Sequence, residues 1–477
     1  MTNLNATIVW FRHDLRLGDN PALTAALGRG GPVIPVFIWA PEEEGRWPPG
    51  AASRWWLHQS LAALDASLRK AGSRLTIRRG PTLDTLRSLV EETGATAVFW
   101  NRRYEPAIIA RDSKIKSALQ GEGKTAESFN GSLLFEPWTI KTQQATPYRV
   151  FTPFWRACLG QLEPAGPERM PPRFEKPAKW PMSAELRELG LQPMIDWTGG
   201  LREAWHPGEN GARKQLSQFL ENAIADYADQ RNRPDLLGTS RLSPHLHFGE
   251  ISVREIWSEL GNLQMKANAD AIRVYKSELG WREFAHHLLF HFPHTAEEPL
   301  RGEFARFPWR KDTAELRAWQ RGRTGYPIVD AGMRELWHTG WMHNRVRMIV
   351  ASFLVKDLLI SWQEGAAWFW DTLVDADLAN NTLGWQWTAG CGADAAPYFR
   401  VFNPVSQGEK FDPDGAYVRR WVQELQRVPI EWLHKPWESP LDVTTAGLEF
   451  GRNYPRPIVD HSRARQQALD AYRQSNQ

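Results

Sequence analysis

The sequence predicts an α/β domain at residues 1–132, with a doubly wound, Rossmann-like parallel sheet, and an all-helical domain at residues 206–477. A long connector at residues 133–205 is expected to join them. Three observations predict this arrangement. Strand-like and helix-like segments alternate at first, prolines crowd the middle, and helical periodicity dominates from Gly211 onward. A chain of 477 residues is long enough to bury more than one core.

The first domain shows regular alternation of apolar strand-like runs with helical segments. Asp19-Asn20-Pro21 predicts the start of the first helix. Strands are expected at 7–11, 33–39, 75–78 and 97–100, and helices at 22–27, 53–70, 82–93 and 107–119. This spacing indicates a parallel sheet covered by helices on both faces.

The pattern changes near Gly131, after which prolines become frequent. We interpret this stretch as a connector that runs over the surface. Beyond it, segments 346–360 and 368–375 are apolar or amphipathic and predict long helices. The prolines of the connector are Pro164, Pro167, Pro171, Pro172, Pro177, Pro181 and Pro193.

The bulk composition excludes several classes of protein. Hydrophobic residues make up 42% and charged residues 24%, with a mean hydropathy of −0.49, as in soluble globular proteins. We find neither a long apolar run for a membrane span nor a secretory signal. Only Cys158 and Cys391 are present, which excludes a disulfide framework and favours a reducing, cytoplasmic location. The net charge of +3 is mild, so any nucleic-acid contact would need a local basic patch.

Several common motifs are absent or incomplete. The segment 123–125 resembles the end of a P-loop but lacks the leading glycine, and the glycine-rich segment 28–31 follows a helix instead of a strand. Four histidines lie close together in sequence, and we interpret them as packing or capping residues, so no metal is expected. They are His286, His287, His291 and His294.

A glycine- and hydroxyl-rich loop at 237–243 leads into a predicted helix and carries Arg241. Hydroxyls, backbone N–H groups and a guanidinium at a helix start favour phosphate binding, although a simple capping turn is the alternative. Other short motifs follow in order at 10–16, 278–284, 341–348, 375–381, 384–387, 394–400 and 402–404. Together they resemble the photolyase/cryptochrome family over nearly the whole chain.

The resemblance implies that the helical domain binds FAD in a U-shaped form. An Arg347–Asp375 ion pair beside the flavin is also expected because a buried charge needs a partner. Helix capping is the alternative role for Asp375 and Asp377. Asn381 replaces the aspartate of plant-type cryptochromes, which favours repair. The implied FAD-binding residues are Tyr227, Thr239, Ser240, Arg241, Leu242, Ser243, Asn344, Arg347, Asp375, Asp377 and Asn381.

The resemblance also implies a substrate, UV-damaged DNA. Photolyases flip the damaged bases out of the duplex, because a dimer inside the duplex cannot reach a buried flavin. The implied catalytic residues are Glu278, Trp281, Met348 and Trp387; a solvated glutamate and core tryptophans are the alternatives. Members that repair the (6-4) photoproduct have histidines at the positions of Asn344 and Met348. Asn and Met cannot exchange protons near neutral pH, so cyclobutane pyrimidine dimers are the expected lesion.

Trp385, Trp362 and Trp309 match the family's electron-transfer chain, with core packing as the alternative. DNA contacts are expected mainly with phosphates, which would make affinity fall with salt. The implied contacts are Glu278, Trp281, Arg282, Asn344, Arg345, Arg347 and Trp387, together with Arg231, Arg233 and the Lys410 region.

A second, antenna pigment is expected, either methenyltetrahydrofolate or a deazaflavin. Ile108 and Ile109 stand where some folate-binding members have an Asn-Glu pair, and Tyr275 replaces a tryptophan of other members. A monomer is expected. The main alternative function is a signalling cryptochrome, although the chain ends at Gln477 without a low-complexity tail. Repair of the (6-4) lesion, or a flavoprotein that shares only the α/β domain, are further alternatives.

Overall fold

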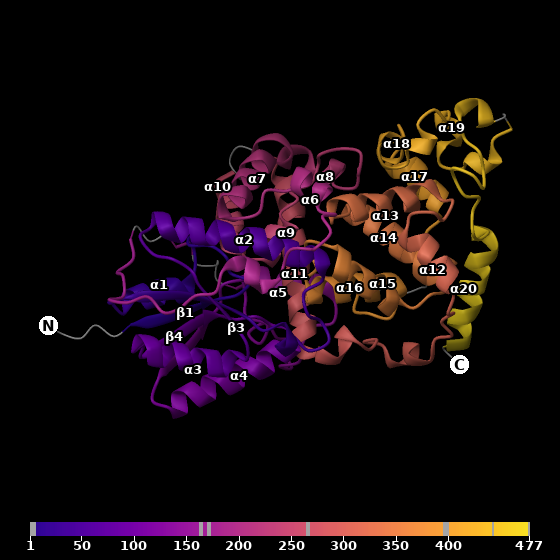
Figure 1. Cartoon of the computed structure of the whole chain (residues 1–477). Helices are drawn as coiled ribbons and strands as arrows, with labels where there is room; N and C mark the ends of the chain where they lie inside the picture. Colours follow the sequence, from indigo (N-terminus) through magenta and orange to yellow (C-terminus); the bar gives the residue numbers. More distant parts are fainter. Residues whose placement is uncertain are drawn as a thin grey trace.

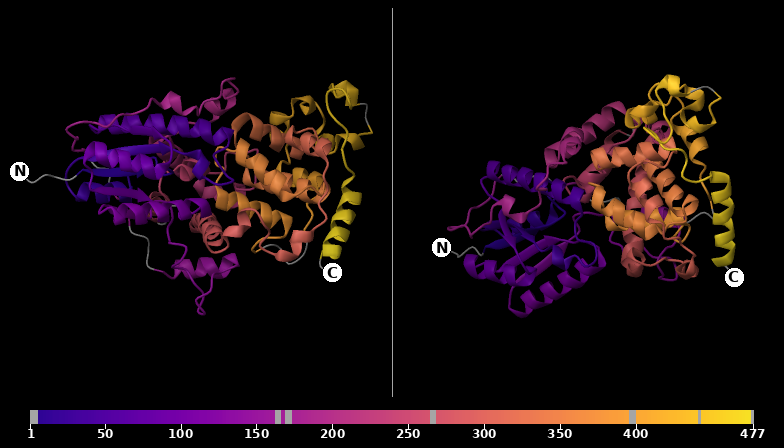
Figure 2. Two further views of the ribbon diagram at one scale, coloured as in Figure 1. Left: turned by 60° about the horizontal axis from the view of Figure 1, so that its bottom comes forward. Right: turned by 45° about the vertical axis from the view of Figure 1, so that its right-hand side comes forward.

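A computed structural model describes residues 6–161, 166–168, 173–263, 268–394, 400–440 and 443–475. Two bodies lie side by side, an α/β body and a larger helical one, with the C-terminal helix α20 (His461–Ser475) farthest from the sheet (Figures 1 and 2). Residues 395–399 of the motif at 394–400 lie outside the described residues, as do Pro164, Pro171 and Pro172.

The N-terminal body contains a five-stranded parallel sheet, which confirms the predicted fold class. Its strand order is β3-β2-β1-β4-β5, so the direction of winding reverses at β1. The strand β5 was not predicted, because it lies at an edge and includes an exposed Glu127 instead of a continuous apolar run. The strands are β1 (Thr7–Phe11), β2 (Val33–Trp39), β3 (Thr76–Arg79), β4 (Ala97–Asn101) and β5 (Thr125–Phe129).

Alternating residues of the strands build two cores, one on each face of the sheet. On one face, Phe11 and Phe37 pack with α1 (Pro21–Gly28) and α2 (Ala51–Lys70). On the other, Trp10 packs with residues of α3 (Thr82–Thr93) and α4 (Pro106–Gly121). Because both faces are covered, the buried strands are continuously apolar, which is why they could be recognised in the sequence.

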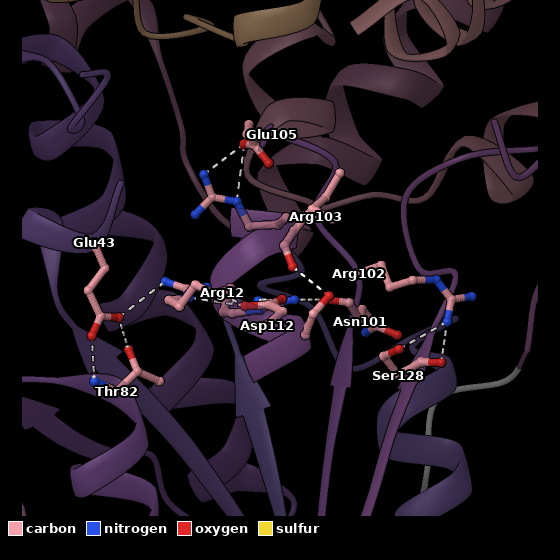
Figure 3. A network of polar contacts seen from close by, with 12 residues as sticks. Arg12, Glu43, Thr82, Asn101, Arg102, Arg103, Glu105, Asp112 and Ser128 are labelled. Carbon is pink, nitrogen blue, oxygen red and sulfur yellow. Dashed lines mark hydrogen bonds and ion pairs between the residues drawn. The ribbon is translucent and has the colours of Figure 1, made fainter. Parts of the chain in front are cut away.

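A dense polar network fills the carboxyl edge of the sheet, where doubly wound folds commonly bind ligands (Figure 3). Arg12 forms an ion pair with Asp112 at 2.5 Å. Arg103 bonds both Glu44 at 2.8 Å and Glu105 at 2.7 Å. Since carboxylates of the chain itself neutralise these arginines, the network fixes the loops at this edge.

The predicted connector contributes more than a linker, which corrects the prediction of a segment that only runs over the surface. Helix α5 (Phe151–Leu159) packs against α11 (Ala269–His291) of the helical body. Phe154 and Trp155 share a core with Phe284. Gly280 is needed at this contact because a Cβ there would overlap the indole of Trp155.

The helical body is built around α11 and the neighbouring helices α13, α14, α15 and α16. The predicted helix at 346–360 differs in detail: α14 ends at Ser352 and continues as a π-helical turn, Phe353–Asp357. None of the described helices is long and apolar enough to cross a membrane. Besides α11 and α20, the described helices from residue 199 onward are α6 (Gly199–Ala204), α7 (Glu209–Asn222), α8 (Tyr227–Gln230), α9 (Ser243–His247), α10 (Val253–Leu263), α12 (Thr313–Gln320), α13 (Pro327–Thr339), α14 (Asn344–Ser352), α15 (Trp362–Thr372), α16 (Leu378–Ala389), α17 (Pro404–Phe411), α18 (Ala416–Trp421) and α19 (Ile430–Leu433).

Candidate active site

A cavity of about 370 Å³ lies among α8, α9, α11, α14, α15 and α16 in the helical body. Every residue that was predicted to bind FAD lines it, from Tyr227 to Asn381. Glu278, Trp281, Arg282, Met348 and Trp385 line it as well. Segments more than 150 residues apart in sequence therefore meet at one place.

One end of the cavity is polar and contains Arg241. This residue has a positive φ of 52°, a conformation that is uncommon for a side chain of this kind. Its guanidinium lies between two indoles, 4.4 Å from the centroid of Trp205 and 4.9 Å from that of Trp341. The Trp341 Nε1 group donates to the Ser243 hydroxyl at 3.2 Å. The fixed cation and the adjacent hydroxyls make this end suitable for phosphate groups.

The predicted ion pair between Arg347 and Asp375 is present. The Arg347 Nη2 atom lies 2.8 Å and 3.1 Å from the two carboxylate oxygens of Asp375, which is buried. The Arg347 Nε group also donates to the Met342 carbonyl at 2.7 Å. Two anchors therefore hold the guanidinium at the cavity wall.

Asp377 has two roles, because it caps α16 and also lines the cavity. It accepts a hydrogen bond from the Asn380 backbone N–H at 2.8 Å, so the capping alternative is correct for this residue. His286 and His247 lie 3.5 Å and 3.8 Å from its carboxylate. Burial would raise the pKa of Asp377, but these two histidines hold it well below its usual value.

Glu278 and Trp281 lie at the side of the cavity where substrate was predicted. The Glu278 carboxylate pairs with Arg231 at 2.7 Å. Burial raises the pKa of Glu278, and the Arg231 charge partly opposes this effect. The ring of Trp281 stacks on Phe151 of α5, with a centroid separation of 3.8 Å and an interplanar angle of 9°. The Trp281 ring is thus held in place by a helix from the predicted connector.

The three tryptophans predicted to transfer electrons differ in burial. Trp385 lines the cavity, Trp362 is buried at the start of α15, and Trp309 is partly exposed. Ring contacts of Trp385 join it to Phe369 at 5.0 Å and to Trp319 at 6.2 Å. Of the three, Trp309 alone is partly exposed, and a role of these residues in electron transfer stays a prediction.

Trp387 is not among the residues that line the cavity, although Gly384 and Thr388 on the same helix are. Its predicted substrate contact therefore stays a prediction. Sequence reasoning also missed several lining residues. Tyr275, Trp341 and His247 belong to recognisable or aromatic-rich segments, whereas Phe369 gave no signal in the sequence because it looks like any core residue.

The basic residues near the cavity differ in how far they are already neutralised. Arg231 and Arg233 pair with Glu278 and Asp235 at 2.7 Å and 2.5 Å. In contrast, Arg345 bonds the Asn232 amide oxygen at 2.7 Å and lies over the ring of Phe411 at 4.5 Å. Lys410 lies 5.3 Å from the same ring. Within the described ranges, Arg345 has no carboxylate partner, so its charge is available to a phosphate.

Three of the four histidines that were predicted to pack or cap bond backbone carbonyls, whereas His294 is exposed; His286 bonds the Arg282 carbonyl at 3.0 Å and also lies beside Asp377. His287 and His291 both bond the Pro137 carbonyl, at 3.2 Å and 3.0 Å. His287 also accepts a hydrogen bond from the Tyr148 N–H at 3.1 Å. In the part of the chain that the structure describes, no group of three His, Cys, Asp or Glu side chains is arranged to hold a metal ion.

Glu335 lies behind the cavity wall and gives a pH-dependent stability. It accepts from the Tyr417 hydroxyl at 2.6 Å, and burial raises its pKa from 4.5 to about 7 despite this bond and the nearby Arg241 and Arg347. Between these two pH values the folded protein holds a proton that the unfolded chain has released. Stability therefore falls as pH rises through this window.

We expect Glu335→Gln to remove that loss, which amounts to on the order of 3 kcal/mol. Urea unfolding followed by circular dichroism at about pH 5 and about pH 8 measures it. At the higher pH, the free energy of unfolding of the variant should exceed that of the parent protein. Parallel pH profiles for the two proteins would show that Glu335 is not the group responsible.

Comparisons with known proteins agree with this geometry. A family model described as DNA photolyase matches residues 7–175, and one described as the FAD binding domain of DNA photolyase matches residues 275–474. A deoxyribodipyrimidine photo-lyase from Agrobacterium fabrum is 52% identical over 467 residues, which are 98% of this chain and 97% of that protein. This chain belongs to the DNA photolyase family.

Two further photolyase-family proteins show how far the similarity extends. A crystal structure of a class III photolyase from Agrobacterium tumefaciens superposes with a TM-score of 0.97 and 50% identity, covering 100% of this chain and 98% of that one. Cryptochrome-1 of Arabidopsis thaliana is 43% identical over 481 residues, which are 96% of this chain and 69% of that protein. The family thus includes proteins with both names.

The cavity of this photolyase-family protein has the groups that FAD requires. Its polar end supplies Arg241 and hydroxyls for a pyrophosphate. The same cavity supplies aromatic walls and the Arg347–Asp375 pair for a flat, polar-edged ring system. The Trp385 Nε1 group is buried and has no acceptor among the described residues, as expected where a bound group would complete the wall.

Proposed function

We propose that this protein uses light and bound FAD to split cyclobutane pyrimidine dimers in UV-damaged DNA. The observation that carries the proposal is the composition of one cavity, where FAD-type walls continue into Glu278, Trp281, Asn344 and Met348. Curated relatives named deoxyribodipyrimidine photo-lyase support it. Neither Asn344 nor Met348 can act as an acid or a base, which favours the cyclobutane lesion over the (6-4) photoproduct.

In this proposal, FAD bound in its reduced form would supply light-driven one-electron chemistry that opens the dimer ring with no net oxidation or reduction. Arg241 and the hydroxyls of 239–243 would hold the phosphates. Arg347, which is fixed by Asp375, would orient the ring system together with Asp377 and Asn381. Trp281 stacks on the flipped-out dimer. Glu278, whose pKa is raised by burial and lowered in part by Arg231, lies where its carboxyl group can hydrogen-bond the edge of a pyrimidine.

A direct assay tests the proposal and separates it from a receptor function. The purified, chemically reduced protein is illuminated with an oligonucleotide that contains one cyclobutane dimer. We expect the dimer to disappear under blue light and to remain in the dark. If it persists in the light while the flavin still responds to illumination, a cryptochrome-like receptor is the better conclusion; the similarity to cryptochrome-1 makes that the second candidate.

We expect Trp362→Phe to slow light-driven reduction of the oxidised protein at least tenfold, because phenylalanine is far harder to oxidise than tryptophan. Flavin absorbance recorded after timed periods of blue-light illumination measures this rate. Repair by chemically pre-reduced protein should be unaffected, which serves as the internal control. Reduction at the parental rate would remove Trp362 from the electron-transfer path.

We expect Arg345→Ala to weaken binding of dimer-containing DNA by about tenfold and to lower the salt dependence of affinity by about one ion. The reason is that its charge is not neutralised by a carboxylate, in contrast to Arg233. Fluorescence anisotropy across a salt series measures both quantities. Arg233→Ala is the matched control, with a smaller expected effect. Equal effects of the two variants would contradict this assignment.

We further propose that the protein acts as a cytoplasmic monomer and binds an antenna pigment, either methenyltetrahydrofolate or a deazaflavin. The antenna part of this proposal is supported by the direct contact of the α/β body with the helical body. Trp56 of α2 donates to Glu250 at 3.0 Å across that junction. Absorbance of the purified protein after FAD has been accounted for would identify the pigment, and size-exclusion chromatography with light scattering would give the assembly state.

A further inference from the structure

A second groove lies in the helical body, on a different face of α15 from the FAD-type cavity. It is lined by residues of α12, α13, α15 and α18 and encloses about 920 Å³. The neighbouring residues Trp368 and Phe369 of α15 divide between the two sites, since Trp368 lines the groove and Phe369 lines the cavity. A volume of this size is in the range of small-molecule sites.

Two tryptophans form a flat platform in this groove. Trp337 is 66% exposed although tryptophan is usually well buried. Its ring is nearly parallel to that of Trp368, with an interplanar angle of 5° and a centroid separation of 5.9 Å. An exposed indole supported in this way offers a π-face on which a planar ring can stack.

The groove is also strongly basic. Arg317, Arg321, Arg334 and Arg420 line it, and all except Arg334 are exposed. Arg334 pairs with Glu424 at 2.8 Å. The other three have no carboxylate partner in the described portion of the chain. Three guanidinium charges thus lie around the platform without a counter-charge from the protein.

A third observation comes from Trp421, which lines the same groove. Its Nε1 group is buried and finds no acceptor among residues that the structure describes. A buried indole N–H normally has a partner, and an oxygen of a bound molecule would supply one. Planar stacking, excess positive charge and an unused donor together define a ligand with a flat ring and several anionic oxygens.

We propose that this groove binds a nucleoside polyphosphate, with the base stacked on Trp337 and the phosphates against Arg317, Arg321 and Arg420. A free nucleotide fits better than a DNA strand, because α15 separates the groove from the cavity where a lesion would lie. The proposal goes beyond the repair function and does not depend on it. The groove is a binding site only, and no reaction is assigned to it.

Isothermal titration of the FAD-loaded full chain with ATP, and separately with GTP, tests the proposal. We expect saturable binding that weakens at least about tenfold in Trp337→Ala, that is largely kept in Trp337→Phe, and that also weakens in Arg321→Ala/Arg420→Ala. Trp197→Ala and Arg465→Ala, which replace an exposed tryptophan and an exposed arginine elsewhere, are matched controls with parental affinity expected. Flavin absorbance and repair of dimer-containing DNA report that each variant is folded.

Three results would overturn the proposal. One is the absence of binding heat at nucleotide concentrations up to about 5 mM, which would place the dissociation constant above the millimolar range. Another is equal affinity in Trp337→Ala and the parent protein. The last is displacement of the nucleotide from the groove by a short undamaged single-stranded oligonucleotide at much lower concentration, which would assign the groove to nucleic acid instead. Loss of repair with intact nucleotide binding would count against the proposed function alone.

Discussion

Gly365→Val is expected to yield a protein that has lost bound FAD and much of its stability. Gly365 lies on α15 where this helix meets α16, and a Cβ at this position would overlap the Cη2, Cζ3 and Cζ2 atoms of the Trp385 indole. Trp385 is buried and lines the cavity, so it can yield only by moving into the space that the cofactor needs. Overpacking of this kind costs on the order of 3 kcal/mol.

Flavin content after purification and the free energy of unfolding in urea measure the two effects. Gly261→Ala is the matched control. This glycine lies in α10, and a Cβ there would meet nothing within 4 Å. It should stabilise the protein by about 0.5–1 kcal/mol because alanine favours a helix. A Gly365→Val protein that keeps its flavin and unfolds at the parental urea concentration would refute the close α15–α16 contact.

The second large effect is expected from Arg347→Met, which leaves the buried Asp375 carboxylate without its cation. Removing one partner of such a pair costs about 3–5 kcal/mol. Here the substitution also removes the hydrogen bond to the Met342 carbonyl. We expect lower stability of the flavin-free protein and at least a hundredfold weaker binding of FAD, measured by urea unfolding and by fluorescence titration.

The double variant Arg347→Met/Asp375→Asn separates the charge effect from lost packing. Neutralising Asp375 removes the uncompensated charge, so the double variant should be more stable than Arg347→Met alone. If both variants lose the same stability, burial of an unpaired carboxylate is not the cause of the effect.

The parts of the fold that were predictable are those whose sequence pattern depends on burial alone. Strands β1, β2 and β4 are fully buried and read as apolar runs. Edge strand β5 has an exposed Glu127, and α5 lies in a proline-rich region, so local pattern concealed both. The end of α14 at Ser352, where a π-helical turn follows, depends on tertiary packing and leaves no clear local signal.

The candidate site was predictable to the extent that its residues belong to short, ordered motifs. The resemblance placed Arg347 and Asp375 at the flavin, and the requirement of a buried charge for a partner then favoured their pairing. Phe369 and Gly365 could not be found, because an apolar residue and a helical glycine have the same appearance anywhere in a helix. Their importance comes from contacts across α15 and α16 that only the folded chain shows.

The stack of Phe151 on Trp281 has a consequence for how the molecule can be divided. The Trp281 ring lines the cavity and packs on a helix that lies more than a hundred residues earlier in the sequence, before the helical body begins. A fragment starting at residue 206 would keep the residues that line the cavity but would lose Phe151, which supports Trp281, and Trp205, which packs on Arg241. The helical body is therefore not a self-sufficient module, since residues that precede it in sequence support both parts of its cavity.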